Sequence, residues 1–214
     1  MTTLGFLKKI YFTTISVADL KEPASYFTVA GNGEGRLTEK MSRFLSFAFH
    51  ISSAEEAKEI IKDFSNRYHD ARHVCWAYML GPLRETYLSS DNGEPSGTAG
   101  KPILGQINSA CLTDVLVVVV RYFGGIKLGT PGLIAAYREA ARLALADAGK
   151  KEITRTTTFV VRCDYPELHK VMKIIKDYDL TIVSQNIENI CNLVVEVPVT
   201  LTNTIGNYHY FTHK

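Results

Sequence analysis

The sequence predicts an α+β protein with two domains, and three observations support this prediction. The chain has 214 residues, of which 46% are apolar and 21% are charged, so it can bury a substantial core. An apolar strand at 115–123 runs into a clearly bounded helix at 130–149. After residue 150 the pattern becomes strand, helix, strand, strand, which is most of a small α+β unit. We therefore expect one domain over 25–149 and a second over 153–214.

The opening segment has lysines in its middle and no continuous apolar block, so it predicts neither a signal peptide nor a membrane span. We interpret residues 1–24 as an N-terminal extension. The cysteines are widely spaced among apolar neighbours, which predicts reduced, packed thiols, with no metal and no cofactor. A cytoplasmic protein with no membrane contact is the corresponding expectation. The cysteines are Cys75, Cys111, Cys163 and Cys191.

The first elements of the N-terminal domain alternate between strands and a helix. GNGEG at 31–35 predicts a turn, and the alternation over 43–51 predicts a strand. Ser53 and Glu56 have the spacing of a capping box at a helix start. Residues 71–80 are rich in aromatic and β-branched side chains and predict the next strand. The apolar face of the helix would consist of Ala57, Ile60, Ile61, Phe64 and Tyr68.

A long polar stretch at 81–102 is dense in glycine, proline, serine and threonine, which predicts a loop. Loops of this length inside a compact domain are more often functional than idle. Residues 102–111 then predict a short helix.

The strand at 115–123 is apolar on both faces, which predicts a central place in a sheet. In the following helix Thr130 is the predicted N-cap, Pro131 suits the first turn, and Gly149 ends the helix. Small side chains on its inner face permit close packing on the sheet. That face would consist of Leu133, Tyr137, Ala140, Ala144 and Ala148, flanked by Ile134, Ala141 and Leu145.

The second domain is predicted to hold strands at 156–165, 181–188 and 191–199 and a helix at 166–179. The tail, residues 200–214, is short for the helix and final strand that would complete a split β-α-β sandwich. We therefore expect this domain to be shortened.

The glycine-rich segment between the central strand and its helix has two open interpretations. Backbone N–H groups and the helix dipole favour an anion there, and Arg121 and Lys127 add positive charge. The spacing is that of neither a dinucleotide site nor a Walker loop, and glycines also make tight turns. The local pattern does not decide between an anion site and a turn.

The formal net charge is only +2, so the chain as a whole is not a polycation. Between Lys101 and Lys151, however, seven Lys or Arg stand against three Asp or Glu, which predicts a local basic surface. Tyr122 would stack on a base or belong to the core. The candidate nucleic-acid or anion-binding residues are Lys101, Arg121, Tyr122, Gly124, Gly125, Lys127, Gly129 and Thr130.

Asp91, Glu94 and His73 are candidates for acid–base chemistry. Carboxylates in turns more often accept hydrogen bonds from nearby backbone N–H groups, which favours a structural role for both acids. His73 would share a strand face with Cys75, either as a hydrogen-bonded sheet residue or as one wall of a polar pocket. His69 and His73 would point apart, so they predict no metal site.

Three stretches together resemble the YigZ/Impact family, over about residues 25–148: DARHVCWAY, SSDNGEPSGTAGKPIL and VLVVVVRYFGGIKLGTPGLIAAY. The sequence is therefore identified as similar to the bacterial two-domain members. The resemblance implies a first domain with the β-α fold shared by the second domain of a small-subunit ribosomal protein and by domain IV of elongation factor G. It implies a ferredoxin-like second domain. The motif residues are Asp70, Arg72, His73, Gly93, Glu94, Pro95, Ser96, Gly97 and Thr98.

Two positions depart from the family pattern. Asn92 stands where the family has aspartate, which removes one carboxylate, and Pro131 stands where it has glycine, which removes one N–H from the anion site. The eukaryotic Impact proteins are translational regulators, so the resemblance implies a translation-linked role.

The leading hypothesis is a non-enzymatic, cytoplasmic, translation-associated protein that binds RNA or a ribosomal partner through the basic glycine-rich loop. The alternative is a hydrolase or phosphoryl-handling enzyme with a polar cleft of His73, Asp91, Glu94 and Arg121. A third possibility is a module that binds a protein partner in translational control.

Overall fold

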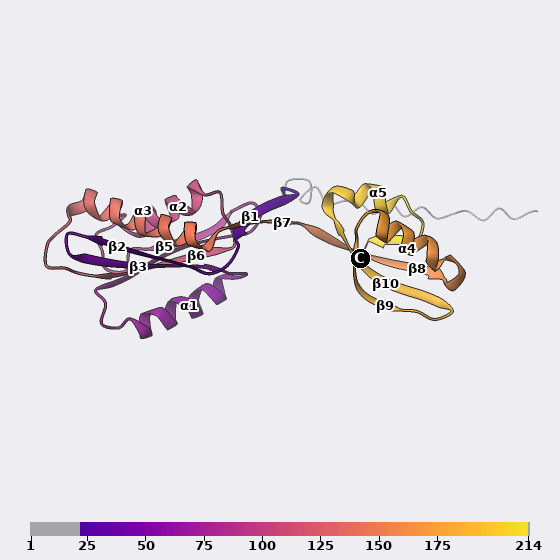
Figure 1. The fold of residues 1–214 in the computed structure, drawn as a ribbon, viewed down its shortest axis with the longest axis horizontal. Helices are drawn as coiled ribbons and strands as arrows, with labels where there is room; N and C mark the ends of the chain where they lie inside the picture. Colours follow the sequence, from indigo (N-terminus) through magenta and orange to yellow (C-terminus); the bar gives the residue numbers. More distant parts are fainter. Residues whose placement is uncertain (1–21, 214) are drawn as a thin grey trace, which may run out of the picture. The chain divides into compact units, whose positions relative to one another are not determined.

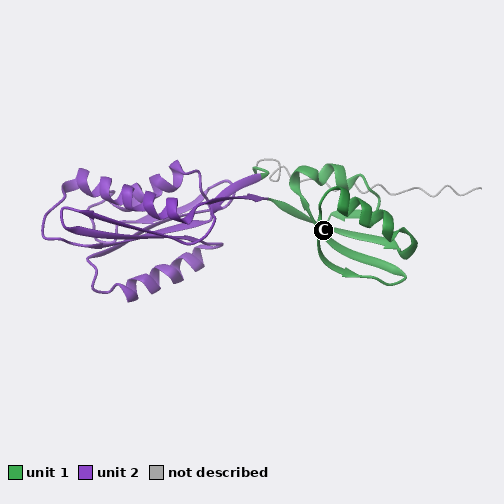
Figure 2. Cartoon of the chain, viewed as in Figure 1, with its two compact units in different colours: residues 1–24, 155–214 green, residues 25–154 purple. Residues whose placement is uncertain are grey.

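The computed structural model describes residues 22–213, and the chain divides into two compact units (Figure 2). The N-terminal unit comprises residues 25–154, and the C-terminal unit comprises residues 155–213 with residues 22–24. The N-terminal unit extends past Gly149 because β1 (Ser25–Val29) pairs with β7 (Lys150–Thr154) in antiparallel orientation.

A five-stranded antiparallel sheet forms the centre of the N-terminal unit, with the order β2-β3-β6-β4-β5. β6 is the central strand, as its apolar sequence predicted, and its residues from Val115 to Arg121 are all buried. The strands are β2 (Gly33–Glu39), β3 (Ser42–His50), β4 (His73–Leu80), β5 (Thr86–Ser90) and β6 (Val115–Tyr122).

Helices cover both faces of this sheet (Figure 1). α2 (Gly100–Ser109) and α3 (Gly129–Ala148) lie on one face, and α1 (Ala54–Arg67) lies on the other. Successive β6 side chains alternate between the two cores: Val117 packs in the core under α2 and α3, and Val118 packs in the core under α1.

The predicted helix faces are confirmed in large part. All five predicted inner residues of α3 are buried, together with Ala136, and Ile134 is half-buried. In α1 the predicted face packs on the sheet, and Ser53 Oγ accepts a hydrogen bond from Glu56 N–H at 3.1 Å. The Glu56 carboxylate accepts from Ser52 N–H at 2.8 Å instead of from Ser53, so the capping box is half formed.

The turn predicted at residues 31–35 is wrong in part, because Gly33 and Gly35 belong to β2. A Cβ atom on Gly33 would lie 2.2 Å from the Ala144 carbonyl oxygen, so this glycine allows α3 to approach the strand closely. The hairpin turn between β2 and β3 is at Lys40 and Met41, whose φ angles are 44° and 63°.

Further boundaries differ from the sequence prediction. β5 interrupts the loop predicted over 81–102. The N-cap prediction for Thr130 is wrong: α3 begins at Gly129, whose φ of 71° lets the chain enter the helix earlier, and Leu128 occupies the cap position. Gly149, with a φ of 68°, ends α3 as predicted.

The C-terminal unit contains a four-stranded antiparallel sheet with the order β11-β8-β10-β9. The tail forms a helix and a last strand, contrary to our expectation, because Ile205 is buried in the core and Phe211 pairs with Val161. The elements are β8 (Thr156–Asp164), α4 (Leu168–Asp177), β9 (Thr181–Asn186), β10 (Ile190–Pro198), α5 (Thr202–Gly206) and β11 (Phe211–His213).

All four cysteines are free thiols, and three of them are buried, but Cys111 is exposed and departs from the predicted packing. The extension predicted over 1–24 lies outside the described residues up to residue 21. Its last residues contact the C-terminal unit, where Arg155 N–H donates to the Ala24 carbonyl oxygen at 2.9 Å and the Arg155 guanidinium pairs with Glu22. None of the helices within residues 22–213 is long and apolar enough to span a membrane.

Candidate functional site at the two motif loops

The polar loop between β5 and α2, residues 91–99, is organised by the carboxylate of Asp91. One oxygen of Asp91 accepts a hydrogen bond from Gly97 N–H at 2.8 Å. The other accepts from Ala99 and Gly100 N–H at 2.9 and 2.8 Å. Partial burial acts to raise the pKa of Asp91, but these donors and the charge of Lys101 hold it below its ordinary value. Asp91 therefore caps α2, in line with the structural role favoured from sequence.

Glu94 uses side-chain partners instead. Its Oε1 accepts from Arg121 Nη1 at 2.6 Å and from the Tyr137 hydroxyl at 2.8 Å, and His73 Nε2 lies 3.8 Å away. Glu94 is buried, so it joins the polar loop to β6, α3 and β4 from inside the unit. The expectation that both acids bond to nearby backbone is wrong for Glu94, because its partners come from distant segments.

Arg121 is buried as well, with 5% of its surface exposed. Its Nη2 donates to Ser42 Oγ at 3.4 Å, and Ser42 Oγ also accepts from Gly124 N–H at 3.2 Å. The guanidinium lies 5.5 Å from the centre of the Phe44 ring. The ion pair Arg121–Glu94 thus connects the polar loop to the glycine-rich loop, and its charges are matched inside the unit.

The neighbouring Cys75 thiol donates to the Asp91 carbonyl oxygen at 2.9 Å, and its sulfur lies 3.3 Å from the Tyr137 hydroxyl oxygen. Burial raises the pKa of Cys75 to about 12, so the thiol stays protonated near neutral pH. Burial also raises the pKa of Tyr137. These two groups therefore serve as hydrogen-bonding core residues and not as nucleophiles.

His73 and Asn92 form a second connection within the polar loop. His73 Nδ1 lies 2.9 Å from the Asn92 carbonyl oxygen, so His73 is a hydrogen-bonded residue of the sheet. The Asn92 side-chain amide donates to the Val74 carbonyl oxygen at 2.9 Å. An ionised aspartate has no proton to donate to that carbonyl, so the family's aspartate would lose this bond.

The glycine-rich loop, residues 123–128, follows β6, and its side chains at 123, 126 and 127 face outward while Leu128 is buried. A Cβ atom on Gly124 would lie 2.0 Å from the Met41 carbonyl carbon, and Gly125 has a φ of 90°. Both positions therefore need glycine for structural reasons, as the turn interpretation expects. Phe123 and Ile126 are 48% and 50% exposed, and Lys127 is exposed as well.

Beside this loop is a pocket of about 500 Å³ at the ends of β3, β4 and β6. Arg43 and Arg72 are exposed, and neither makes an ion pair with a residue that the structure describes. The Arg43 guanidinium lies 5.0 Å from the centre of the Tyr122 ring. The pocket is lined by Met41, Arg43, Asp70, Ala71, Arg72, Tyr122 and Phe123.

Tyr122 is held in place by Asp70, whose carboxylate accepts from the Tyr122 hydroxyl at 3.0 Å. Burial and this acceptor raise the pKa of Tyr122. Sequence reasoning missed Arg43, because only the register of β3 and β6 brings it opposite Tyr122. The alternation of residues 43–51 predicted a strand but did not show which strand would pair with it.

The remaining candidates divide into exposed and structural positions. Lys101 and Thr130 are exposed in the first turns of α2 and α3. Thr98 is buried and donates to the Pro95 carbonyl oxygen at 2.6 Å, while Pro95 and Ser96 are exposed. Gly93, Gly97 and Gly129 have left-handed φ angles of 85°, 76° and 71°. Within the described residues, no three His, Cys, Asp or Glu side chains gather closely enough to hold a metal ion.

The comparisons with known proteins agree with the three motif stretches. The family model of the Impact N-terminal domain matches residues 40–145. The IMPACT family member of Haemophilus influenzae is 36% identical over 160 residues, which cover 74% of this chain and 78% of the relative. YigZ of Escherichia coli is 35% identical over 161 residues, covering 74% and 79%, and YvyE of Bacillus subtilis is 39% identical over 147 residues, covering 69% and 68%. A crystal structure described as a hypothetical protein is 32% identical, with a TM-score of 0.64 over 85% of this chain and 89% of that one.

Proposed function

This chain belongs to the IMPACT family, and from that premise we propose that it is a cytoplasmic, translation-associated regulatory protein that binds RNA. The binding surface is the glycine-loop surface, which we define as the glycine-rich loop with the adjacent pocket. The link to translation comes from the resemblance, because the eukaryotic Impact proteins are translational regulators.

One observation carries the RNA proposal: two exposed arginines, neither of them paired with an acid within residues 22–213, flank the half-buried Tyr122 and the exposed Phe123. Guanidinium groups bind phosphates, and exposed aromatic rings stack on unpaired bases. Lys127 adds a further cation in the loop itself. Arg121 is the exception among the sequence candidates. We assign it to supporting the loop, because Glu94 already balances its charge.

Fold analogy adds support for a ribosomal setting. The C-terminal unit has the element order β-α-β-β-α-β and the antiparallel strand order β11-β8-β10-β9, which we interpret as ferredoxin-like. We likewise propose that the N-terminal unit is related to the ribosomal-protein domain and to elongation factor G domain IV. Such analogy suggests a binding partner but does not identify a site.

The enzyme alternative has less support. His73, Glu94 and Arg121 do converge, as an active site requires, but Glu94 and Arg121 are buried and bonded to each other. Neither described pocket is lined by these residues. A substrate screen repeated on Glu94→Gln tests this alternative, and turnover that is lost in the variant while its fold persists would revive it.

The experiment for RNA binding uses the full chain and a labelled single-stranded RNA oligonucleotide titrated at increasing salt. Each phosphate contact contributes about −0.7 to the slope of log affinity against log salt for single strands. The Arg43→Ala/Arg72→Ala variant should therefore bind more weakly and with a slope shallower by about 1.4. Arg162→Ala, an exposed arginine of the C-terminal unit, is the control. An equal loss in the control, or no salt dependence in the wild type, would contradict the proposal.

A further inference from the structure

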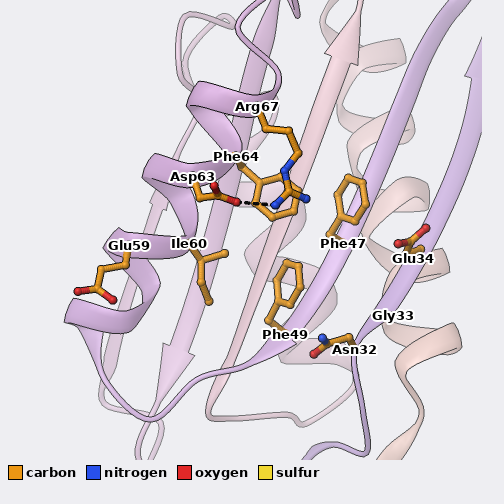
Figure 3. Close-up of a pocket in the computed structure, with 10 residues that line it drawn as sticks. All are labelled: Asn32, Gly33, Glu34, Phe47, Phe49, Glu59, Ile60, Asp63, Phe64 and Arg67. Atoms are coloured by element: carbon orange, nitrogen blue, oxygen red, sulfur yellow. Dashed lines mark hydrogen bonds and ion pairs between the residues drawn. The ribbon is translucent and has the colours of Figure 1, made fainter.

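A second pocket lies in the N-terminal unit between α1 and β3, with a volume of about 460 Å³ (Figure 3). We call it the α1–β3 pocket. Ile60 and Phe64 from α1 face Phe47 and Phe49 from β3 across it. The centre of the Phe64 ring lies 4.9 Å from that of Phe47 and 5.5 Å from that of Phe49. Phe47 and Phe49 are only half-buried, so part of this aromatic cluster is open to solvent.

The strand register explains why the apolar floor ends where it does. Glu34 of β2 pairs with Phe47 of β3 and therefore lies on the same face of the sheet. The neighbouring positions Gly33 and Gly35 approach α3 on the opposite face. β2 thus contributes a carboxylate to the pocket edge in place of another apolar side chain.

The rim of the pocket is negatively charged. Glu34 lies on its β2 side and Glu59 on its α1 side (Figure 3). Neither carboxylate makes a hydrogen bond or ion pair with a residue in the described part of the chain. Asp63 pairs with Arg67 at 2.7 Å, so the two unpaired glutamates set the sign of the rim.

Arg67 shows how a cation binds at this surface. Its guanidinium lies 5.2 Å from the centre of the Phe64 ring and pairs at the same time with Asp63. A basic side chain of another protein would find the same kind of partners, an aromatic ring and a carboxylate, at Phe47 and Glu34, which are paired across β3 and β2. RNA phosphates would be repelled by these acids, which separates this pocket from the glycine-loop surface.

We propose that the α1–β3 pocket docks a protein segment that presents one large apolar side chain next to lysine or arginine. The apolar side chain fills the pocket against the phenylalanine rings, as anchor residues do in protein interfaces. The basic residues pair with Glu34 and Glu59. This proposal is independent of RNA binding.

The test uses two synthetic peptides, one with a central phenylalanine flanked by lysines and one with glutamates in place of the lysines. Binding is measured by fluorescence anisotropy on the full chain, and the site is mapped by NMR shifts of the phenylalanine rings. The lysine peptide should bind at least about tenfold more tightly than the glutamate peptide, which corresponds to about 1.4 kcal/mol. Its binding should shift the ring signals of Phe47 and Phe49.

Glu34→Lys/Glu59→Lys should weaken the lysine peptide about tenfold. Glu55→Lys, on the same helix but outside the pocket, is the control for a single charge reversal and should leave the affinity for the lysine peptide within about twofold. Both replace exposed glutamates whose carboxylates have no partner within residues 22–213, so the fold and the RNA affinity should stay unchanged in both variants. Equal affinity for the two peptides, no binding of the lysine peptide, or shifts confined to other residues would overturn the proposal. A change of oligomeric state in the double variant would do so too, because a second copy would then be the occupant.

Discussion

The two motif loops of the N-terminal unit turn their side chains in opposite directions. In the polar loop, Asp91 and Glu94 turn inward and are bonded to backbone or buried side chains. In the glycine-rich loop, Phe123, Ile126 and Lys127 turn outward. Residues of one family motif therefore divide into those that build the surface and those that are free to bind.

The largest effect is expected for Arg121→Ala, which tests the inward role of the polar loop because it leaves Glu94 buried without its cation. Removing one partner of a buried pair costs about 3 to 5 kcal/mol, so the free energy of unfolding in urea should fall by that amount. Arg43→Ala, at the exposed pocket, should change it by less than about 0.5 kcal/mol. Similar small losses in both variants would show that the ion pair does not support the loop.

A comparison within the glycine-rich loop comes next. A methyl group on Gly124 meets the Met41 backbone, so Gly124→Ala should destabilise the unit by up to about 3 kcal/mol. Gly125 has open space around it, so the only cost of Gly125→Ala is the left-handed φ angle. This should lower the free energy of unfolding by about 1 kcal/mol. Urea unfolding of both variants checks the order, and a larger loss at Gly125 would contradict the described contact with the hairpin turn.

Asp91 supplies a pH-dependent prediction of intermediate size. Asp91→Asn should lower the free energy of unfolding by about 2 kcal/mol at neutral pH, because an amide nitrogen cannot accept the backbone N–H bonds that one of the two carboxylate oxygens accepts. The pKa of Asp91 is lowered in the folded state, so its contribution is present above about pH 4 and is lost as the pH falls through the lower folded-state pKa. The stability difference between wild type and variant should therefore shrink in acid. If the stability difference between wild type and variant grew in acid, the folded protein would stabilise the protonated Asp91 side chain and not its carboxylate.

The smallest effect is expected for chemical modification of Cys75, which lies on β4 beside the polar loop. It tests whether a reactive thiol is present there. Because burial raises the pKa of Cys75 to about 12, a thiol reagent near neutral pH should modify exposed Cys111 and leave Cys75 intact. Peptide mapping by mass spectrometry reads this directly. Rapid modification of Cys75 in folded protein would favour the enzyme alternative.

Local pattern was sufficient for elements whose burial is periodic, such as β6, the apolar face of α1 and the inner face of α3. It failed where distant segments decide the structure. Gly33 and Gly35 look like a turn until α3 is known to pack on them, and the tail looks too short until Phe211 pairs with β8.

The candidate site, like the fold, was predictable where local pattern decides it and not where distant segments meet. The three motif stretches identified the loops, and turn chemistry predicted that Asp91 accepts hydrogen bonds from nearby backbone N–H groups, although not that it caps α2. The burial of Arg121 did not follow, because nothing in the local sequence shows that Glu94 lies beside it. Arg43 was missed for the same reason, since it reaches Tyr122 only through the pairing of β3 and β6.

The most direct test of the outward role of the glycine-rich loop is ultraviolet crosslinking of the full chain to single-stranded RNA, with crosslinked residues identified by mass spectrometry. The division between the loops predicts crosslinks at Tyr122 and Phe123, whose rings line the pocket beside Arg43 and Arg72. Crosslinks confined to residues 91–99 or to the C-terminal unit, or no crosslinks at all, would contradict it.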